Sequence, residues 1–240
     1  MSDSSTSRPR RPLVRPGFDP AAQPWRVADQ GLPAIAAERL TADALRRGWQ
    51  SRAPWEQDGI VASEVRYPGR EGKPVLAAVL IPMVLRPDGV RVLLTQRAAH
   101  LHDHAGQISF PGGRIEDDDA SPVAAALREA QEETGLGQEY VEILGTMPAY
   151  DTSTGFSVTP VAALVRPGFT LVADAFEVAE IFEVPLSFLM DPANHRLYQA
   201  SLPDGRVRQY YAMPWEKYFI WGATAGMLRN LYHALRASLR

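Results

Sequence analysis

The sequence predicts a mixed α/β sandwich, in which strands pack with one strongly marked helix. Two apolar segments within residues 75–97 are typical of buried strands, and a capped helix follows at residues 121–135. Further strand-like segments lie at residues 141–147 and 157–165. Because strands and a helix alternate along the chain, these elements favour an α/β domain over an all-α or all-β one.

The first residues of the chain differ in composition from the rest. The first twenty are rich in Ser, Pro and Arg, which is typical of a disordered tail. Residues 40–50 have a helical pattern, with Thr41 as the N-cap and Gly48 as the end of the helix. We therefore expect residues 1–45 to form an N-terminal extension that is at least partly disordered, and residues 46–240 to form the functional domain.

Residues 75–97 are predicted to form a β-hairpin. The apolar run VLAAVLIPMVL is followed by a turn at residues 86–90 and by the strand-like RVLLTQR. A loop is expected at residues 98–113, and the apolar residues 223–239 are typical of a C-terminal helix.

Composition and charge exclude several classes of protein. The 25 Lys and Arg residues against 28 Asp and Glu give a net charge of −3, so no nucleic-acid partner is expected. The chain has no cysteine, which excludes disulfides, cysteine-ligated metals and a cysteine nucleophile. Because there is neither a membrane-spanning apolar run nor a secretory signal, we expect a cytoplasmic protein without a membrane partner. The sequence does not predict the oligomeric state.

The helix at residues 121–135 has a clear beginning and end. Ser121 is a good N-cap, Pro122 suits the first helical turn, and Gly135 ends the helix. The helical repeat places an apolar stripe toward the sheet, formed by Val123, Leu127, Ala130 and Thr134.

The same helix carries an acidic face. Glu129, Glu132 and Glu133 are neighbours on the helix, so their charges repel one another unless a cation lies close. Arg128 can neutralise Glu132, and a hard divalent cation such as Mg²⁺, which prefers oxygen ligands and is often completed by substrate phosphates, suits the others. The glycine pair at residues 112–113 lets the backbone approach a ligand closely. A solvated acidic surface is the alternative interpretation.

Residues 112–136, GGRIEDDDASPVAAALREAQEETGL, resemble the Nudix box, whose core is Arg-Glu-hydrophobic-X-Glu-Glu-X-Gly-hydrophobic. That core runs here from Arg128 to Leu136. The box usually has an acidic residue eight positions before its arginine, where this chain has Ala120, and a loop longer by one residue would bring Asp119 to that point as an outer metal ligand. The resemblance implies a Nudix-type α/β/α sandwich with a mixed β-sheet.

The segments that flank the Nudix box resemble one branch of the family in particular. LLTQRAAHLHDHAGQISFPGG, residues 93–113, resembles the segment that marks the coenzyme A pyrophosphatase branch of Nudix hydrolases, although that branch more often has arginine where His102 stands. Similarity to this branch extends over residues 73–235. It implies hydrolysis of the pyrophosphate bond of coenzyme A, or of its acyl or oxidised forms, to 3′-phospho-AMP and 4′-phosphopantetheine.

The resemblance also implies roles for the acidic helix. Glu129 and Glu133 would be ligands of Mg²⁺ or Mn²⁺, and Arg128 would orient the glutamates. Glu132 would be a further ligand or the catalytic base that activates the attacking water. Two distal carboxylates are alternatives for that base, those of Glu177 and Glu180.

Coenzyme A also needs hydrogen-bond donors for its phosphates and a surface for its adenine. Arg97, His104 and Arg114 are candidate donors, and the backbone at Gly112 and Gly113 permits close approach. The aromatic candidates for adenine are Tyr150, Phe156 and Trp221, of which the last two are more typical of core packing.

Other interpretations remain open from the residues alone. The alternating His100, His102 and His104 permit a zinc site, although loop histidines are more often surface groups. The nearest alternative function is a Nudix hydrolase of another small nucleoside diphosphate derivative, such as ADP-ribose, a nucleotide sugar or NADH. A non-catalytic nucleotide-sensing module on the same fold is the other.

Overall fold

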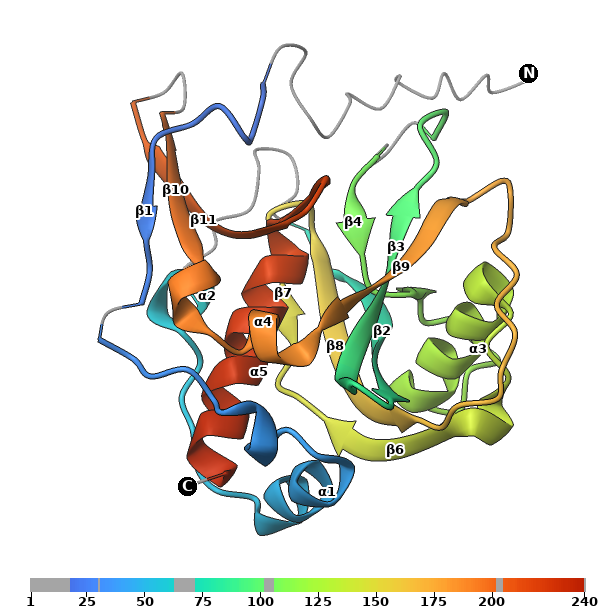
Figure 1. The fold of residues 1–240 in the computed structure, drawn as a ribbon. Helices are drawn as coiled ribbons and strands as arrows, with labels where there is room; N and C mark the ends of the chain where they lie inside the picture. Colours follow the sequence, from blue (N-terminus) through green and yellow to red (C-terminus); the bar gives the residue numbers. More distant parts are fainter. Residues whose placement is uncertain (1–17, 30, 63–71, 102–105, 202–204, 240) are drawn as a thin grey trace, which may run out of the picture.

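The computed structural model describes residues 18–29, 31–62, 72–101, 106–201 and 205–239. These residues form two β-sheets, one of eight strands and one of four, with helices packed around them (Figure 1). Within this part of the chain, every helix is too short or too polar to cross a bilayer.

The eight-stranded sheet is mixed, as the sequence predicts. At its centre β2 (Val75–Arg86) pairs antiparallel with β3 (Gly89–Arg97) and parallel with β8 (Phe156–Val165). Its other strands are β4 (Ile108–Ser109), β5 (Gly112–Arg114), β6 (Val141–Thr146), β7 (Tyr150–Asp151) and β9 (Val178–Pro185). The main order is β4-β3-β2-β8-β6, while β5, β7 and β9 pair with β2, β8 and β3.

Both faces of this sheet are covered, which explains why β2 is apolar at nearly every position. Helix α3 (Pro122–Thr134) packs on one face, and α5 (Ala223–Ser238) lies on the other (Figure 1). Side chains along a strand alternate between its two faces, so Leu80 packs in the cluster beneath α3 and its neighbour Ile81 in the cluster with α5.

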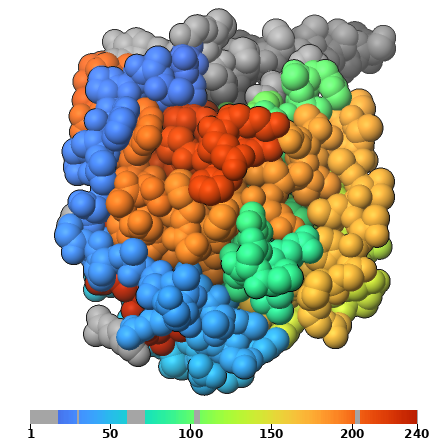
Figure 2. Space-filling view, viewed as in Figure 1, coloured from blue at the N-terminus to red at the C-terminus, as the bar shows by residue number. Residues whose placement is uncertain are grey.

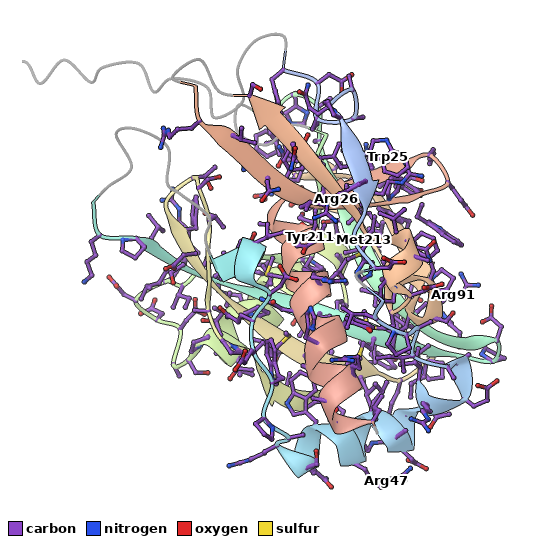
Figure 3. All side chains as sticks on the ribbon, turned by 90° about the vertical axis from the view of Figure 1, so that its left-hand side faces the viewer. Trp25, Arg26, Arg47, Arg91, Tyr211 and Met213 are labelled. Carbon is purple, nitrogen blue, oxygen red and sulfur yellow. The ribbon has the colours of Figure 1, made fainter. Side chains whose placement is uncertain are left out.

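The second sheet is antiparallel and was not predicted from the sequence. Its order is β1-β10-β11-β12, with bounds Trp25–Val27, Arg196–Ser201, Val207–Trp215 and Tyr218–Trp221. Tyr211 and Met213 of β11 point toward α5 (Figure 3). Trp25 lies on the other side of the sheet, where its ring is 6.1 Å from that of Tyr198.

The N-terminal part of the described chain packs against the remainder. Strand β1 pairs with β10, and α1 (Ala42–Ser51) contacts α5 and β6. Figure 2 shows these residues in blue along one edge and the base of the molecule. The expected division after residue 45, which falls within α1, stays a prediction, and residues 1–17 lie outside the described residues.

The short helices that remain are η1 (Ala37–Arg39), α2 (Gly59–Ala62), η2 (Gln138–Tyr140), α4 (Leu186–Leu189) and η3 (Pro192–Asn194).

Helix α3 begins and ends as predicted. The Ser121 hydroxyl accepts a hydrogen bond from the N–H of Ala124 at 3.1 Å, and Gly135 ends the helix with φ of 69°. The hairpin of β2 and β3, strands β6 and β8, and helix α5 also lie at their predicted positions. The predicted apolar stripe of α3 is buried only in part: Ala130 and Thr134 are buried, whereas Val123 and Leu127 are partly buried against the same cluster. Ala125 and Ala126, which lie outside that stripe, are fully buried.

Two predictions of local structure were wrong. Gly48 does not end α1, which continues to Ser51. A Cβ at Gly48 would lie 2.9 Å from side-chain atoms of Ser238 and Leu239, so the glycine allows α1 to approach the end of α5 closely. Within the loop expected at residues 98–113, the structure has β4 and the start of β5, which are too short to show a strand pattern in the sequence and form strands through pairing with β3 and β2.

A buried polar cluster joins α5 to the second sheet. Arg229 is fully buried, and its Nε lies 3.3 Å from Asp58, which also accepts a hydrogen bond from the Tyr211 hydroxyl at 2.9 Å. Burial lowers the pKa of His195 to about 4, so this ring is neutral; its Nε2 lies 2.8 Å from the Leu189 carbonyl. The Nδ1 of His195 then accepts from Arg229 at 3.1 Å. The cluster therefore fixes β11 against α5.

Replacing Asp58 by Asn is expected to cost about 3–5 kcal/mol of unfolding free energy, because it leaves the buried Arg229 cation without its carboxylate. Urea denaturation measures this loss. Asp88→Asn is the matched control, since the Asp88 carboxylate is 61% exposed where it pairs with Arg91, and we expect it to cost less than about 1 kcal/mol. Equal losses in the two variants would contradict a structural role for the cluster.

Candidate functional site

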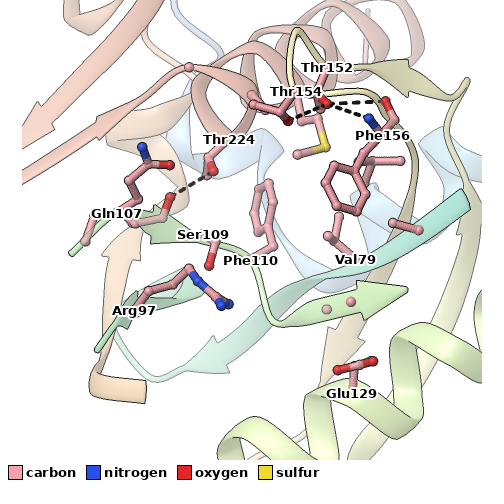
Figure 4. Close-up of a pocket in the computed structure, with 18 of the residues that line it drawn as sticks. Val79, Arg97, Gln107, Ser109, Phe110, Glu129, Thr152, Thr154, Phe156 and Thr224 are labelled. Atoms are coloured by element: carbon pink, nitrogen blue, oxygen red, sulfur yellow. Dashed lines mark hydrogen bonds between the residues drawn. The ribbon is translucent and has the colours of Figure 1, made fainter. Parts of the chain in front are cut away.

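A cavity of about 550 Å³ is lined by residues of α3, of α5 and of strands from both sheets (Figure 4). Its lining is rich in charge. The acidic residues are Glu116, Glu129, Glu133 and Glu177, and the basic residues are Arg97, Arg114 and Arg208. The fold thus brings together ionisable groups that lie far apart in the sequence.

Glu133 is the most deeply buried carboxylate of this cavity. Its side chain is 5% exposed, the N–H of Gly112 donates to Oε2 at 3.2 Å, and Nη1 of Arg97 lies 3.8 Å from Oε1. Burial raises the pKa of Glu133 to about 8, and the charges of Glu129 and Glu177 act in the same direction. The ionised carboxylate is therefore destabilised unless a further cation approaches it.

Glu129 lies one helical turn before Glu133 and packs against the backbone of β5. Its side chain is 16% exposed, and burial raises its pKa. A Cβ at Gly113 would come within 2.6 Å of its Oε2, and a Cβ at Gly112 would collide with the backbone of β2 at Ala78. Both glycines are required because β5 lies tightly between β2 and the glutamates of α3.

Arg128 forms hydrogen bonds with three acidic side chains beside the cavity. Its Nη1 donates to Glu129 and Glu132, each at 3.0 Å, and its Nε and Nη2 donate to Asp119 at 3.1 and 2.9 Å. Nη2 also donates to the carbonyl of Arg114 at 3.2 Å. The hydrogen bonds to Asp119 raise the pKa of Arg128, which stays charged. Arg128 therefore holds Glu129 in place and ties it to β5.

The three glutamates do not share one face, contrary to the sequence prediction. Glu132 is 58% exposed and is absent from the cavity lining, whereas Glu129 and Glu133 line it. The reason is the helical repeat of about 100° per residue, which places Glu129 and Glu133 about 40° apart but rotates Glu132 by about 100° from Glu133. Asp119 is 7% exposed, and its hydrogen bonds with Arg128 lower its pKa.

Arg97 and Arg114, both predicted as phosphate donors, line the cavity. Figure 4 shows the Arg97 side chain pointing into it, and the Nε of Arg97 is buried without a hydrogen-bond partner among the described residues. The Cζ of Arg114 lies 5.8 Å from the centre of the Phe156 ring. The buried Nε gives Arg97 a donor for an anionic group in the cavity.

The histidine predictions are only partly covered by the structure. His102 and His104 lie outside the described residues. The ring of His100 packs against that of Phe176, with centres 5.1 Å apart. Among the described residues, no group of three or more His, Cys, Asp and Glu side chains is placed to hold a metal ion.

The aromatic residues divide differently from the expectation. Phe156 and Trp221 pack against apolar clusters, as the sequence favoured, and they also line the cavity, which core packing alone does not predict. Tyr150 is 5% exposed and belongs to the core; its ring contacts α5 at Gly226, where a Cβ would lie 2.7 Å from the Tyr150 hydroxyl.

Of the distal carboxylates, Glu177 lines the cavity and Glu180 does not. Glu180 accepts hydrogen bonds from Lys217 at 3.0 Å and from the Tyr218 hydroxyl at 2.7 Å. Sequence analysis also missed Arg208 and Ser153 of the lining, because neither belongs to a charged or glycine-rich motif. Side chains two residues apart in a strand lie on the same face, so Arg208 shares a face of β11 with Tyr210. This alternation is the one signal in the sequence that could have indicated where Arg208 lies.

The residues present fit a hard divalent cation. Glu129 and Glu133 offer carboxylate oxygens, and both have pKa values raised chiefly by burial, so a cation between or beside them would relieve that cost. Mg²⁺ and Mn²⁺ accept such oxygens, and Mg²⁺ usually keeps water and phosphate oxygens in its remaining positions. Two protein carboxylates are therefore a suitable donor set.

With EDTA present, Glu133→Gln is expected to stabilise the protein by a few kcal/mol near pH 8. The folded-state pKa of about 8 lies above the ordinary 4.5, so in the wild type stability is lost as pH rises between these values. Glutamine carries no charge, so the advantage of the variant grows from about pH 5 to about pH 8 in urea denaturation. Glu132→Gln, at an exposed side chain, is the control and is expected to show no such trend. An advantage that does not change with pH would contradict the burial argument.

Comparisons with known proteins show the family of this chain. The profile described as the NUDIX domain matches residues 74–200, more than half of the chain. The chain is 43% identical over 158 residues to a protein of Escherichia coli named "Uncharacterized Nudix hydrolase NudL", which covers 65% of this chain and 80% of that protein. A protein of the same name from Cronobacter sakazakii is 44% identical over 155 residues, with the same coverage.

Among solved structures, a MutT/nudix family protein from Enterococcus faecalis matches with a TM-score of 0.41 at 16% identity, covering 82% of this chain and 79% of that one. The family assignment rests on the domain profile and on the bacterial relatives, which agree with each other. The chain therefore belongs to the Nudix family and is a hydrolase of a nucleoside diphosphate derivative.

Proposed function

We propose that the protein hydrolyses the pyrophosphate bond of coenzyme A and releases 3′-phospho-AMP and 4′-phosphopantetheine. One observation carries this proposal. Several described residues of the segment 93–113, which resembles the coenzyme A pyrophosphatases, line the same cavity as Glu129 and Glu133, among them Arg97 and Phe110 (Figure 4). The segment and the acidic helix therefore border one cavity, which supports the proposal that both would contact the same substrate.

Glu129 and Glu133 are the proposed ligands of Mg²⁺ or Mn²⁺. When bound, the cation would neutralise phosphate charge and make water a better nucleophile. Arg128 is a positioning residue, since it holds Glu129 through its Nη1 and ties the helix to β5 through the Arg114 carbonyl. Arg97 would donate from its buried Nε to a phosphate oxygen, and Gly112 keeps Glu133 in place through its N–H.

Glu177 is the proposed catalytic base. Its carboxylate lines the cavity and is close enough to raise the pKa values of Glu129 and Glu133 through its charge. Glu132 and Glu180, the other candidates, are held in ion pairs with Arg128 and Lys217 outside the cavity lining. A base must reach the attacking water, and this requirement favours Glu177.

The purified protein with Mg²⁺ or Mn²⁺ is expected to convert coenzyme A to 3′-phospho-AMP and 4′-phosphopantetheine, and EDTA is expected to stop the reaction. Chromatography of the products measures this.

Glu133→Gln should lower kcat by about 10³-fold, because several kcal/mol of charge stabilisation is lost. Glu139→Gln, at an exposed residue outside the cavity, is the control for loss of one negative charge.

ADP-ribose and NADH are tested separately under the same conditions. Cleavage of these compounds but not of coenzyme A would retain the hydrolase chemistry and overturn the proposed substrate. Binding of coenzyme A without cleavage of any compound would favour the nucleotide-sensing alternative.

Glu177→Gln is expected to lower kcat by about 10²–10⁴-fold with a small change in KM, as for loss of a general base. The matched variant Glu180→Gln removes a carboxylate three residues away that lies outside the cavity lining, and it should keep kcat within a few-fold. Steady-state measurement of kcat and KM for both variants at one pH distinguishes them. The reverse order of effects would assign the base to Glu180.

A further inference from the structure

One wall of the cavity, formed by β11 of the second sheet and the loop between β7 and β8, contains a cation and a hydroxyl that the proposed hydrolysis does not use. Arg208 of β11 is half-buried, and its Nη2 donates to the Ser153 hydroxyl at 3.0 Å. Both residues line the cavity. Ser153 itself is 3% exposed, so this side of the arginine is fixed by a buried partner rather than by solvent.

The loop that carries Ser153 is held rigidly. The hydroxyls of Thr152 and Thr154 are 2.9 Å apart, and Thr152 exchanges backbone and side-chain hydrogen bonds with Phe156 at the start of β8. Figure 4 shows these contacts at one side of the cavity. The loop therefore presents ordered hydroxyl groups to the cavity, and Arg208 lies beside them through its bond to Ser153.

This wall lies across the cavity from the acidic helix. In Figure 4, Thr152 and Thr154 lie on the opposite side from Glu129. A phosphate monoester carries up to two negative charges, so the carboxylates of Glu129 and Glu133 would repel it at their end. A guanidinium with neighbouring hydroxyls is the donor set that suits such a group. Phe156 and Trp221, also in the lining, offer apolar faces for the base of a nucleotide.

We propose that Arg208, oriented by Ser153, binds a phosphate monoester remote from the scissile pyrophosphate. It would thereby select nucleotides whose ribose carries a phosphate group in addition to the pyrophosphate. This inference rests on the proposed function, in which the 3′-phosphate of coenzyme A is that group. Arg208 is then a specificity-determining residue, distinct from the residues that hold the pyrophosphate.

The test compares coenzyme A with dephospho-coenzyme A, which differs only in lacking the 3′-phosphate. The wild type is expected to prefer coenzyme A in kcat/KM, and Arg208→Gln to reduce that preference by about 10–100-fold, as for loss of a charge-assisted hydrogen bond. Arg208→Lys should restore part of the preference because it keeps the charge. Arg206→Gln, at an exposed residue outside the cavity lining, controls for the net charge and should keep the preference. An equal preference in the wild type and Arg208→Gln would overturn the proposal.

A binding measurement separates this proposal from the proposed function. Calorimetric titration with adenosine 3′,5′-bisphosphate and with AMP requires no cleavage. We expect the wild type to bind the bisphosphate more tightly and Arg208→Gln to bind the two alike. This result in a protein that does not cleave coenzyme A would retain the subsite and overturn the proposed function. Cleavage of coenzyme A with equal binding of both probes by the wild type would overturn the subsite alone.

Discussion

Glu129 and Glu133 are pressed by α3 against the backbone of β5, and this contact is the constraint on which the site depends. Two carboxylates in so confined a place require glycine at positions 112 and 113, because a Cβ at either would meet β2 or the carboxylate of Glu129. Burial of both carboxylates costs stability, which the Gly112 N–H, Arg97 and Arg128 offset only in part, since their pKa values stay raised. The fold thus maintains a pair of anions that a cation would stabilise.

Arg128 makes this arrangement compatible with a stable helix. Its guanidinium contacts Asp119, Glu129 and Glu132 at once, so it offsets part of the repulsion between the acidic side chains at this end of α3, while Glu133 lies outside its reach. Asp119, which aligns near the position of an acidic residue in the Nudix box, is occupied with Arg128 and with the N–H of Glu116. Its carboxylate orients the arginine, which in turn contacts Glu129, and a role as an outer metal ligand stays a prediction.

The second sheet and the loop between β7 and β8 together form the wall of the cavity opposite the acidic helix. Strand β11 carries Arg208 toward the cavity and Tyr211 toward the buried cluster of Asp58 and Arg229. The same strand is therefore anchored on α5 on one side and borders the cavity on the other. A charge pair in so apolar a setting is a weak source of net stability but is costly to break. It therefore specifies where β11 lies, and with it the position of Arg208 in the cavity.

The sequence by itself determined the local elements: the cap at Ser121, the stop at Gly135, the hairpin of β2 and β3 and the family motif all depend on neighbours a few residues apart. It also indicated most of the acidic site. Only the tertiary structure decided that Phe156 and Trp221 line a cavity, and that Arg208 shares it with Glu177. These features depend on which surface packs against each side chain, and contacts between residues so distant in sequence leave no local pattern.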